Sequence, residues 1–329
     1  MNWNQKSVLV TGAGGFIGSH LTEMLLDLGA NVHAFLRYDS NQSIGNLEYL
    51  PKEKQKEILF HRGDLRDIEA VKQAVQDVDI IFHLGALIAI PYSYKNPREV
   101  FETNILGTLN ILQAAREYGT EKILHTSTSE VYGTALYVPI DEKHPLQGQS
   151  PYSASKIGAD KLAESFYLSF DVPVTTVRPF NTYGPRQSMR AVISTIIYQA
   201  LTSDKIVLGN TKTTRDFTFV RDTAQGFIQA ATSDRNLGLV TNLGTGEEYS
   251  ILEIANIVKK LLGKNIPIIE NSRERMRPNK SEVYQLLSNP QLSKELFNWE
   301  ASTTMEQGLE QTIDWFKTVK DKYQSDFTI

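Results

Sequence analysis

Two residues of this sequence, Tyr152 and Lys156, have types and a spacing that suit acid–base chemistry. They are the first and last residues of the segment Tyr-Ser-Ala-Ser-Lys. Side chains four residues apart lie on one face of a helix, so a helix here would bring the phenol and the ammonium group together. A nearby ammonium group favours phenolate and lowers the pKa of tyrosine from about 10 toward neutrality. We therefore expect Tyr152 to take a proton from an alcohol. Lys156 would tune that base and hold the ribose of a nicotinamide cofactor.

A second polar group stands upstream, in the segment Thr126–Gly133 (TSTSEVYG), which follows a predicted strand at Lys122–Thr126. Catalytic residues of open α/β sheets gather at the carboxyl ends of strands. Thr128 is placed there to hydrogen-bond a substrate hydroxyl. Glu130 could remove a proton next to a carbonyl, with Ser129 assisting. The alternative for Glu130 is a carboxylate that orients a neighbouring group.

A glycine-rich turn near the start of the chain predicts a dinucleotide-binding site. Residues 11–18 read TGAGGFIG, so glycines recur every third residue between a predicted strand and a predicted helix. Such a turn lets the backbone approach a pyrophosphate, and the first amides of the helix point at the phosphates. The expected cofactor contacts are Gly12, Gly15, Phe16 and Ile17.

The residues after the second and third predicted strands concern the adenosine end of the cofactor. An acid at the end of the second strand usually binds the ribose 2′-hydroxyl of NAD, but the sequence reads Leu36, Arg37, Tyr38. Arg37 would suit a 2′-phosphate, so we expect NADP, with NAD as the alternative. Asp64 and Leu65 are expected near the adenine. Alternatively, Asp64 caps the helix that follows.

The elements that must position these residues alternate between strand and helix. The predicted strands are Ser7–Thr11, Asn31–Leu36, Ile58–His61, Asp79–Leu84, Lys122–Thr126 and Pro173–Val177. The predicted helices are Phe16–Leu28, Asp67–Val75, Pro97–Tyr118 and Tyr152–Phe170. This alternation, with strands apolar on both faces, predicts an α/β fold: a doubly wound parallel sheet of the Rossmann type.

The pattern changes after residue 180 and predicts a smaller α/β substrate domain. Its expected elements are strands at Lys205–Leu208 and Ile266–Ile269 and helices at Ile251–Leu262 and Thr303–Val319. Two segments, Thr223–Ala231 and Leu239–Leu243, are expected to return to the large sheet. The cofactor domain would then comprise residues 1–180 and about 215–243, and the substrate domain residues 181–214 and 244–329.

Composition excludes several classes of protein. The 329 residues carry a net charge of −4, which argues against nucleic acid and anionic membranes as partners. There is no cysteine, which excludes disulfides, a thiolate nucleophile and Cys-based metal sites. We expect no metal, no membrane segment and a cytoplasmic location.

Taken together, the glycine turn, Thr128 and the Tyr152–Lys156 pair resemble the extended short-chain dehydrogenase/reductases that act on nucleotide sugars. The resemblance extends to Asn181–Gln187 (NTYGPRQ), Arg215-Asp216-Phe217 and Arg277-Pro278. It implies a UDP- or GDP-linked hexose as substrate and contacts to it from Asn181, Arg215 and Arg277. It also implies a homodimer in which the helices at Pro97–Tyr118 and Tyr152–Phe170 of two chains form a four-helix bundle.

Within that family, Glu130 favours a 4,6-dehydratase with a tightly bound cofactor that is regenerated in each turnover. Family 4-epimerases commonly have an apolar residue at the position of Glu130. The pair Ser129–Glu130 also occurs in family decarboxylases of nucleotide-linked uronic acids, in which Arg186 or Arg190 would hold the substrate carboxylate. An NDP-uronic acid decarboxylase or a 4-epimerase is therefore the alternative. A redox sensor is disfavoured because such proteins typically lose Tyr or Lys of the pair, and both are present.

Three segments resemble the dehydratases of legionaminic acid biosynthesis, which act on nucleotide-linked N-acetylglucosamine. They are Ala86–Tyr94, Thr126–Thr134 and Pro145–Asp160. This resemblance implies an NDP-N-acetylglucosamine substrate and places Ser93 or Tyr94 near it.

Overall fold

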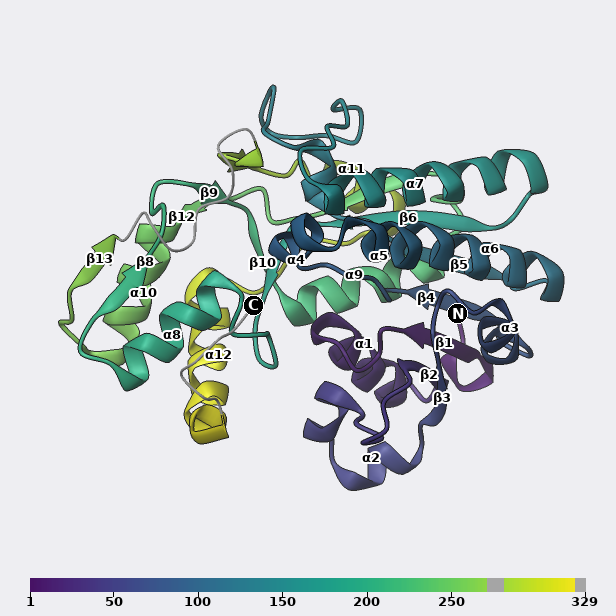
Figure 1. The fold of residues 1–329 in the computed structure, drawn as a ribbon, viewed down its shortest axis with the longest axis horizontal. Coiled ribbons are helices and arrows are strands. Elements are labelled where there is room, and N and C mark those ends of the chain that lie inside the picture. Colours follow the sequence, from purple (N-terminus) through teal and green to yellow (C-terminus); the bar gives the residue numbers. More distant parts are fainter. Residues whose placement is uncertain (271–280, 323–329) are drawn as a thin grey trace.

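The computed structural model describes residues 1–270 and 281–322 and is built around a seven-stranded parallel sheet (Figure 1). Its strand order is β11-β6-β5-β4-β1-β2-β3, and the order reverses between β1 and β4. These strands are β1 (Ser7–Thr11), β2 (Asn31–Arg37), β3 (Leu59–Gly63), β4 (Ile80–His83), β5 (Lys122–Thr126), β6 (Val174–Pro179) and β11 (Val240–Leu243). The predicted doubly wound Rossmann-type fold is confirmed, and such folds bind ligands where the strand order reverses.

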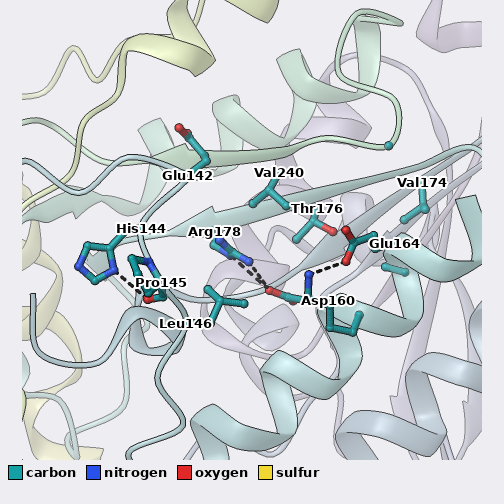
Figure 2. A pocket seen from close by; sticks show the side chains of 13 residues that line it. Glu142, His144, Pro145, Leu146, Asp160, Glu164, Val174, Thr176, Arg178 and Val240 are labelled. Atoms are coloured by element: carbon teal, nitrogen blue, oxygen red, sulfur yellow. Dashed lines mark hydrogen bonds and ion pairs between the residues drawn. The ribbon is translucent and has the colours of Figure 1, made fainter. Parts of the chain in front are cut away.

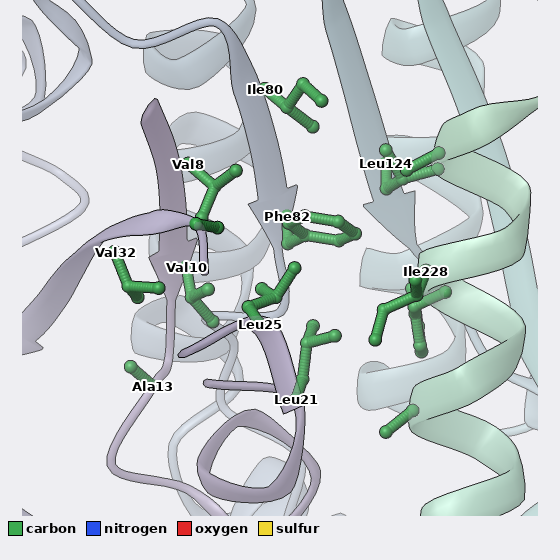
Figure 3. Close-up of a cluster of buried hydrophobic side chains, with 14 of the residues drawn as sticks. Val8, Val10, Ala13, Leu21, Leu25, Val32, Ile80, Phe82, Leu124 and Ile228 are labelled. Atoms are coloured by element: carbon green, nitrogen blue, oxygen red, sulfur yellow. The ribbon is translucent and has the colours of Figure 1, made fainter. Parts of the chain in front are cut away.

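Helices cover both faces of this sheet, which explains its continuously apolar strands. On one face, Leu21 and Leu25 of α1 (Phe16–Asp27) and Ile228 of α9 (Val220–Thr232) pack against Val8 and Phe82 (Figure 3). On the other face, Leu9 and other alternate strand residues pack against three further helices. These are α3 (Ile68–Val75), α6 (Gly107–Tyr118) and α7 (Pro151–Phe170).

Two predicted elements differ from the structure. The segment Thr223–Ala231 returns to the sheet as part of helix α9, whereas Leu239–Leu243 returns as the edge strand β11. The predicted helix Pro97–Tyr118 is divided into α5 (Pro97–Phe101), a π-helical turn over Glu102–Leu106, and α6. Asn104 lies in the π-helical turn, and its buried side chain bonds both Leu87 and Ser155.

A second core lies beside the sheet, on the left of Figure 1. Its buried apolar residues come mainly from α8 (Val192–Thr202), α10 (Ile251–Leu262), α12 (Met305–Val319) and β8 (Ile206–Leu208), which pairs with β13 (Ile268–Glu270). The shorter elements are α2 (Lys52–Lys56), α4 (Ile90–Lys95), α11 (Gln291–Phe297), β7 (Asn181–Tyr183), β9 (Thr214–Arg215), β10 (Phe217–Phe219), β12 (Tyr249–Ser250) and β14 (Gln285–Leu286). Within the described ranges, no helix has both the length and the apolar character needed to cross a membrane.

Candidate active site

The glycine turn lies at the carboxyl end of β1, and the structure shows why Gly12 and Gly18 are glycines. Gly12 has a φ of +70°, which favours glycine. A Cβ atom on Gly18 would lie 2.2 Å from the carbonyl oxygen of Gly12, so glycine at 18 lets α1 approach β1 closely. The N-cap residue of α1 is Gly15, which has no side chain to bond the first amides of the helix. The amides of Phe16 and Ile17 are therefore placed to meet an anion.

A cavity of about 340 Å³ opens beside this turn. Its wall includes five of the predicted cofactor-binding residues, namely Gly12, Gly15, Arg37, Asp64 and Leu65. Gly85, which follows β4, lines it as well. Backbone glycines on one side and charged side chains at the far end suit the pyrophosphate and adenosine parts of a dinucleotide. The residues present therefore fit the predicted cofactor.

The adenosine end of the cavity carries both a cation and an acid. The side chain of Arg37 is 69% exposed, and one of its nitrogens lies 3.7 Å from a carboxylate oxygen of Glu99. Asp39 lines the same cavity two residues further on. The cofactor prediction from the sequence rested on residues 36–38 and did not include this carboxylate. Asp39 could have been found from the sequence because it is an acid in the loop that follows the second predicted strand.

Asp64 and Arg66 form a bidentate ion pair beside the same cavity. The guanidinium of Arg66 donates to both carboxylate oxygens of Asp64, at 2.9 and 2.6 Å. The pKa of Asp64 is lowered, mainly by this bond. The N-cap of α3 is Asp67, whose side chain accepts from Glu69 N and Ala70 N, so the alternative in which Asp64 caps that helix is wrong.

The predicted catalytic pair lies near the start of α7. A capping box between Ser150 and Ser153 fixes the first turn of this helix, and Pro151 occupies its first position. Tyr152 and Lys156 follow one turn apart, and both are buried. The Thr128 side chain, from the segment after β5, hydrogen-bonds Tyr152. The structure thus brings together three of the five predicted catalytic residues.

Burial dominates the electrostatics of this pair. It raises the pKa of Tyr152 above its usual value, the Thr128 hydrogen bond opposes the rise, and the negative charges of Glu130 and Asp160 add to it. Burial lowers the pKa of Lys156 to about 8. The expected lowering of the Tyr152 pKa is therefore not found in the protein alone, because the loss of water around the phenol outweighs other influences.

The two remaining predicted catalytic residues lie on a 3-10 turn, Ser129–Tyr132, next to Thr128. The backbone amide of Glu130 donates to the Thr128 hydroxyl at 3.2 Å. The Glu130 side chain is half-buried, and its charge acts on Tyr152. Ser129 is buried. A carboxylate therefore stands close to the phenol, at the carboxyl end of the sheet.

The predicted substrate contacts have varied surroundings. Ser93 is fully buried, and its hydroxyl donates to the Ile90 carbonyl oxygen at 2.7 Å. The neighbouring Tyr94 is 36% exposed, and its hydroxyl bonds that of Ser281 at 2.5 Å. Asn181 lies on β7, and its amide oxygen is buried with no hydrogen-bond partner among the described residues. Asn181 thus retains an acceptor for a ligand.

The predicted arginines already have protein partners. Arg186 donates to Glu23 of α1 at 2.7 Å. The buried guanidinium of Arg215 donates to three backbone carbonyls, those of Thr214, Val283 and Tyr284. Arg277 falls outside the described residues.

A second cavity, also of about 340 Å³, lies between α7 and the strands β6 and β11. Figure 2 shows Asp160 of α7 and Arg178 of β6 at its wall, joined by hydrogen bonds. Sequence reasoning missed Asp160. Asp160 could have been found from the sequence, because it follows Lys156 by four residues and so lies on the same face of the predicted helix. Over residues 1–270 and 281–322, no group of three or more potential metal ligands is present.

Comparisons with known proteins identify the family of this chain. The sequence profile of the family "GDP-mannose 4,6 dehydratase" matches residues 9–312. A UDP-N-acetyl-alpha-D-glucosaminuronate decarboxylase from Bacillus cytotoxicus is 32% identical over 96% of this chain and 99% of its own length. A dTDP-glucose 4,6-dehydratase from Xanthomonas campestris pv. campestris is 31% identical over 94% of this chain and 93% of its own.

A solved structure is similar along almost its whole length. It is the UDP-glucuronic acid 4-epimerase from Bacillus cereus in complex with UDP-glucuronic acid and NAD, with a TM-score of 0.85 and 29% identity. The match covers 95% of this chain and 99% of that one. The relatives thus include a dehydratase, a decarboxylase and an epimerase of nucleotide sugars. The chain belongs to the GDP-mannose 4,6 dehydratase family, within the extended short-chain dehydrogenase/reductases that act on nucleotide sugars.

Proposed function

We propose that this protein is a nucleotide-sugar 4,6-dehydratase that converts an NDP-hexose to its 4-keto-6-deoxy product. The observation that carries the proposal is the half-buried carboxylate of Glu130 beside Tyr152, Lys156 and Thr128. Tyr, Lys and Thr suffice to oxidise an alcohol and reduce a ketone. Elimination of water also needs a base for the hydrogen next to the new carbonyl, and Glu130 supplies it.

The chain's own residues then account for each proton. Tyr152 takes the proton of the C4 hydroxyl, which Thr128 orients, while the charge of Lys156 stabilises the phenolate. Glu130 takes the proton of C5, which the C4 carbonyl acidifies. The C6–O bond breaks, and the hydroxyl leaves as water with that proton, assisted by Ser129. The chemistry that a bound nicotinamide cofactor would supply is uptake of the hydride from C4 and its return at C6. Glu130, protonated again from solvent, gives a proton to C5, and Tyr152 returns the proton of the C4 hydroxyl to solvent.

The alternative reactions are decarboxylation of a nucleotide-linked uronic acid and 4-epimerisation. The Bacillus cytotoxicus relative and the Ser129–Glu130 pair favour decarboxylation. That reaction needs a cation for the substrate carboxylate. Arg186 is engaged with Glu23, and Arg190 is exposed on the surface. The other terminal nitrogen of Arg186 is buried with no hydrogen-bond partner among the described residues, so Arg186 could still hold a carboxylate and decarboxylation stays the alternative.

For the substrate, we propose a nucleotide-linked N-acetylglucosamine. The proposal rests on the resemblance of residues 86–94, 126–134 and 145–160 to the dehydratases of legionaminic acid biosynthesis. A UDP or GDP nucleotide is expected, and UDP is supported by the Bacillus cereus structure, which holds a UDP-sugar. Asn181, with its unpartnered amide oxygen, is the described residue that we expect to contact the substrate.

For the cofactor, we propose NADP, because Arg37 lines the cavity and its side chain remains largely exposed. NAD is the alternative. It is supported by Asp39 in the same cavity and by the NAD in the Bacillus cereus structure. In either case Lys156, buried one turn after Tyr152, would hold the nicotinamide ribose. The cofactor would stay bound through the turnover, because oxidation and reduction both occur on it.

The proposed reaction is tested by replacing Glu130, the carboxylate that elimination of water needs and that oxidation at C4 does not. In Glu130→Gln, oxidation at C4 should persist, so reduced cofactor accumulates in the absorbance spectrum. Loss of water, followed by mass spectrometry, should slow by roughly 100-fold or more, as is usual when a general base is removed. Glu164→Gln, an exposed carboxylate on the same helix as Tyr152, is the matched control and should behave as the unmodified protein. Full dehydratase activity in Glu130→Gln would refute the mechanism.

A further inference from the structure

A cluster of buried polar side chains lies directly behind the proposed catalytic pair. Its centre is Asp160, one helical turn beyond Lys156 on α7. One carboxylate oxygen lies 3.1 Å from His125 Nε2. The other accepts from the Ser127 hydroxyl at 2.8 Å and from Arg178, whose Nε and terminal nitrogen lie at 3.2 and 2.9 Å. Asp160 is thus fixed by two neighbouring strands, β5 and β6, and by the residue after β5.

Arg178 is held as firmly as its partner. Another of its terminal nitrogens donates to the Tyr132 hydroxyl at 3.0 Å, and its guanidinium lies 4.9 Å from the centre of that ring. The Tyr132 hydroxyl in turn donates to the Asn242 side chain at 2.7 Å. Both Arg178 and Asp160 line the second cavity (Figure 2). The network therefore runs from that cavity to within one turn of Lys156.

The charges around Lys156 come from three elements. On α7, Asp160 is an anion and favours the ammonium form. On β4 and β5, the pKa values of His83 and His125 are lowered, chiefly by burial, so both rings are neutral near pH 7. Tyr152 on α7 has a raised pKa and is also neutral there. Burial itself acts against a charged lysine.

We propose that Asp160 is a positioning residue whose negative charge keeps the buried Lys156 in its ammonium form, and that Arg178 limits how strongly it does so. The inference rests on the proposed role of Lys156 at the cofactor ribose and beside Tyr152. It goes further because it assigns a reason for a buried anion in this place. An asparagine could accept similar hydrogen bonds from Ser127 and Arg178, but it would leave both buried cations, Arg178 and Lys156, without this negative charge.

The test compares variants that change the charge in opposite directions. The readout is the dissociation constant of NAD or NADP, whichever binds more tightly, measured by fluorescence titration across the pH range. Binding should weaken at alkaline pH as Lys156 loses its proton, and we call this decline in affinity the alkaline limb of the pH profile. Asp160→Asn should move this alkaline limb to lower pH by about one unit, the scale expected for a charge one helical turn away. Arg178→Gln should move it to higher pH, and Asp160→Glu should leave it near its original place.

Two further variants keep every outcome informative. In Lys156→Met the alkaline limb should vanish; a limb that persists would refute the proposed role of Lys156 itself. If the limb vanishes in Lys156→Met but does not move in Asp160→Asn or Arg178→Gln, the inference about Asp160 is overturned. Because Asp160→Asn leaves a buried arginine without its counter-charge, its fold is checked by circular dichroism. If Asp160→Asn does not fold, the test uses Arg178→Gln and the double variant Asp160→Asn/Arg178→Gln. The proposal is contradicted if the alkaline limb stays in place both in Arg178→Gln and in the double variant.

Discussion

At the scale of single residues, the site depends on charges that burial makes costly. The phenol of Tyr152 is removed from water, and its pKa rises because the phenolate loses hydration. It can act as a base only when positive charge stands nearby. Lys156 is the described cation one turn away, and its own charge is weakened by the same burial. The catalytic pair therefore depends on its surroundings, which the five-residue segment from Tyr152 to Lys156 does not reveal.

The choice of cofactor is a prediction at this scale. Arg37→Ala should weaken NADP binding by roughly 10-fold, since a 2′-phosphate loses one charge-assisted contact. The affinity for NAD should change much less. Isothermal titration with both cofactors measures this, and Asp39→Asn is the matched variant, which should weaken NAD instead. Equal losses of both affinities in Arg37→Ala would contradict a 2′-phosphate site at this residue.

At the scale of elements, the glycine turn and the helix that follows it could be read from the sequence. The triad at 12, 15 and 18 predicts a tight turn between strand and helix, and the structure has it. The partners of the predicted residues could not be read in this way. Arg186 and Arg215 look free in the sequence, but Glu23 and the carbonyls near residue 284 hold them. Those partners are distant in the chain, and the fold alone brings them close.

The close approach of α1 and β1 gives a prediction for Gly18. In Gly18→Ala the added methyl group would meet the Gly12 carbonyl oxygen at 2.2 Å, so the helix must shift away from the strand. We expect a loss of about 1–3 kcal/mol in the free energy of unfolding and a marked loss of cofactor affinity. Chemical denaturation and cofactor titration measure the two effects.

Gly119→Ala is the control for this prediction. Gly119 has a φ of +70°, but a Cβ atom there would have no neighbour within 4 Å. Its substitution should cost some stability through backbone strain and leave cofactor affinity unchanged. Unchanged cofactor affinity in Gly18→Ala would show that the turn does not form the phosphate site.

At the scale of the whole molecule, the alternation of strands and helices was sufficient to predict a doubly wound parallel sheet and six of its seven strands, because buried parallel strands are continuously apolar. The π-helical turn within Pro97–Tyr118 could not be predicted in that way. It depends on bonds from Asn104 to Leu87 and Ser155, which belong to other segments. The second core consists mainly of helices, together with short strands whose pairing joins distant segments, such as β8 with β13.

The outer helices of the sheet carry exposed apolar side chains, which support the proposed homodimer. They are Phe101, Leu106, Tyr118, Leu168 and Phe170 of α5, the π-helical turn, α6 and α7. Leu168 is the most exposed of these, at 72%. Leu168→Glu should therefore shift the protein from dimer to monomer in sedimentation velocity. Leu136→Glu, 66% exposed on a loop, is the control and should remain dimeric. A monomer in the unmodified protein would remove the expectation.

The central claim is that Glu130 adds elimination of water to the redox chemistry of Tyr152 and Lys156. The most direct measurement incubates the protein with UDP-N-acetylglucosamine and GDP-N-acetylglucosamine deuterated at C4, and locates the label by NMR and mass spectrometry. We expect a product that has lost water, carries a C4 ketone and bears the deuterium on its C6 methyl group. Deuterium that remains at C4 of an epimerised sugar, with no loss of water, would contradict it.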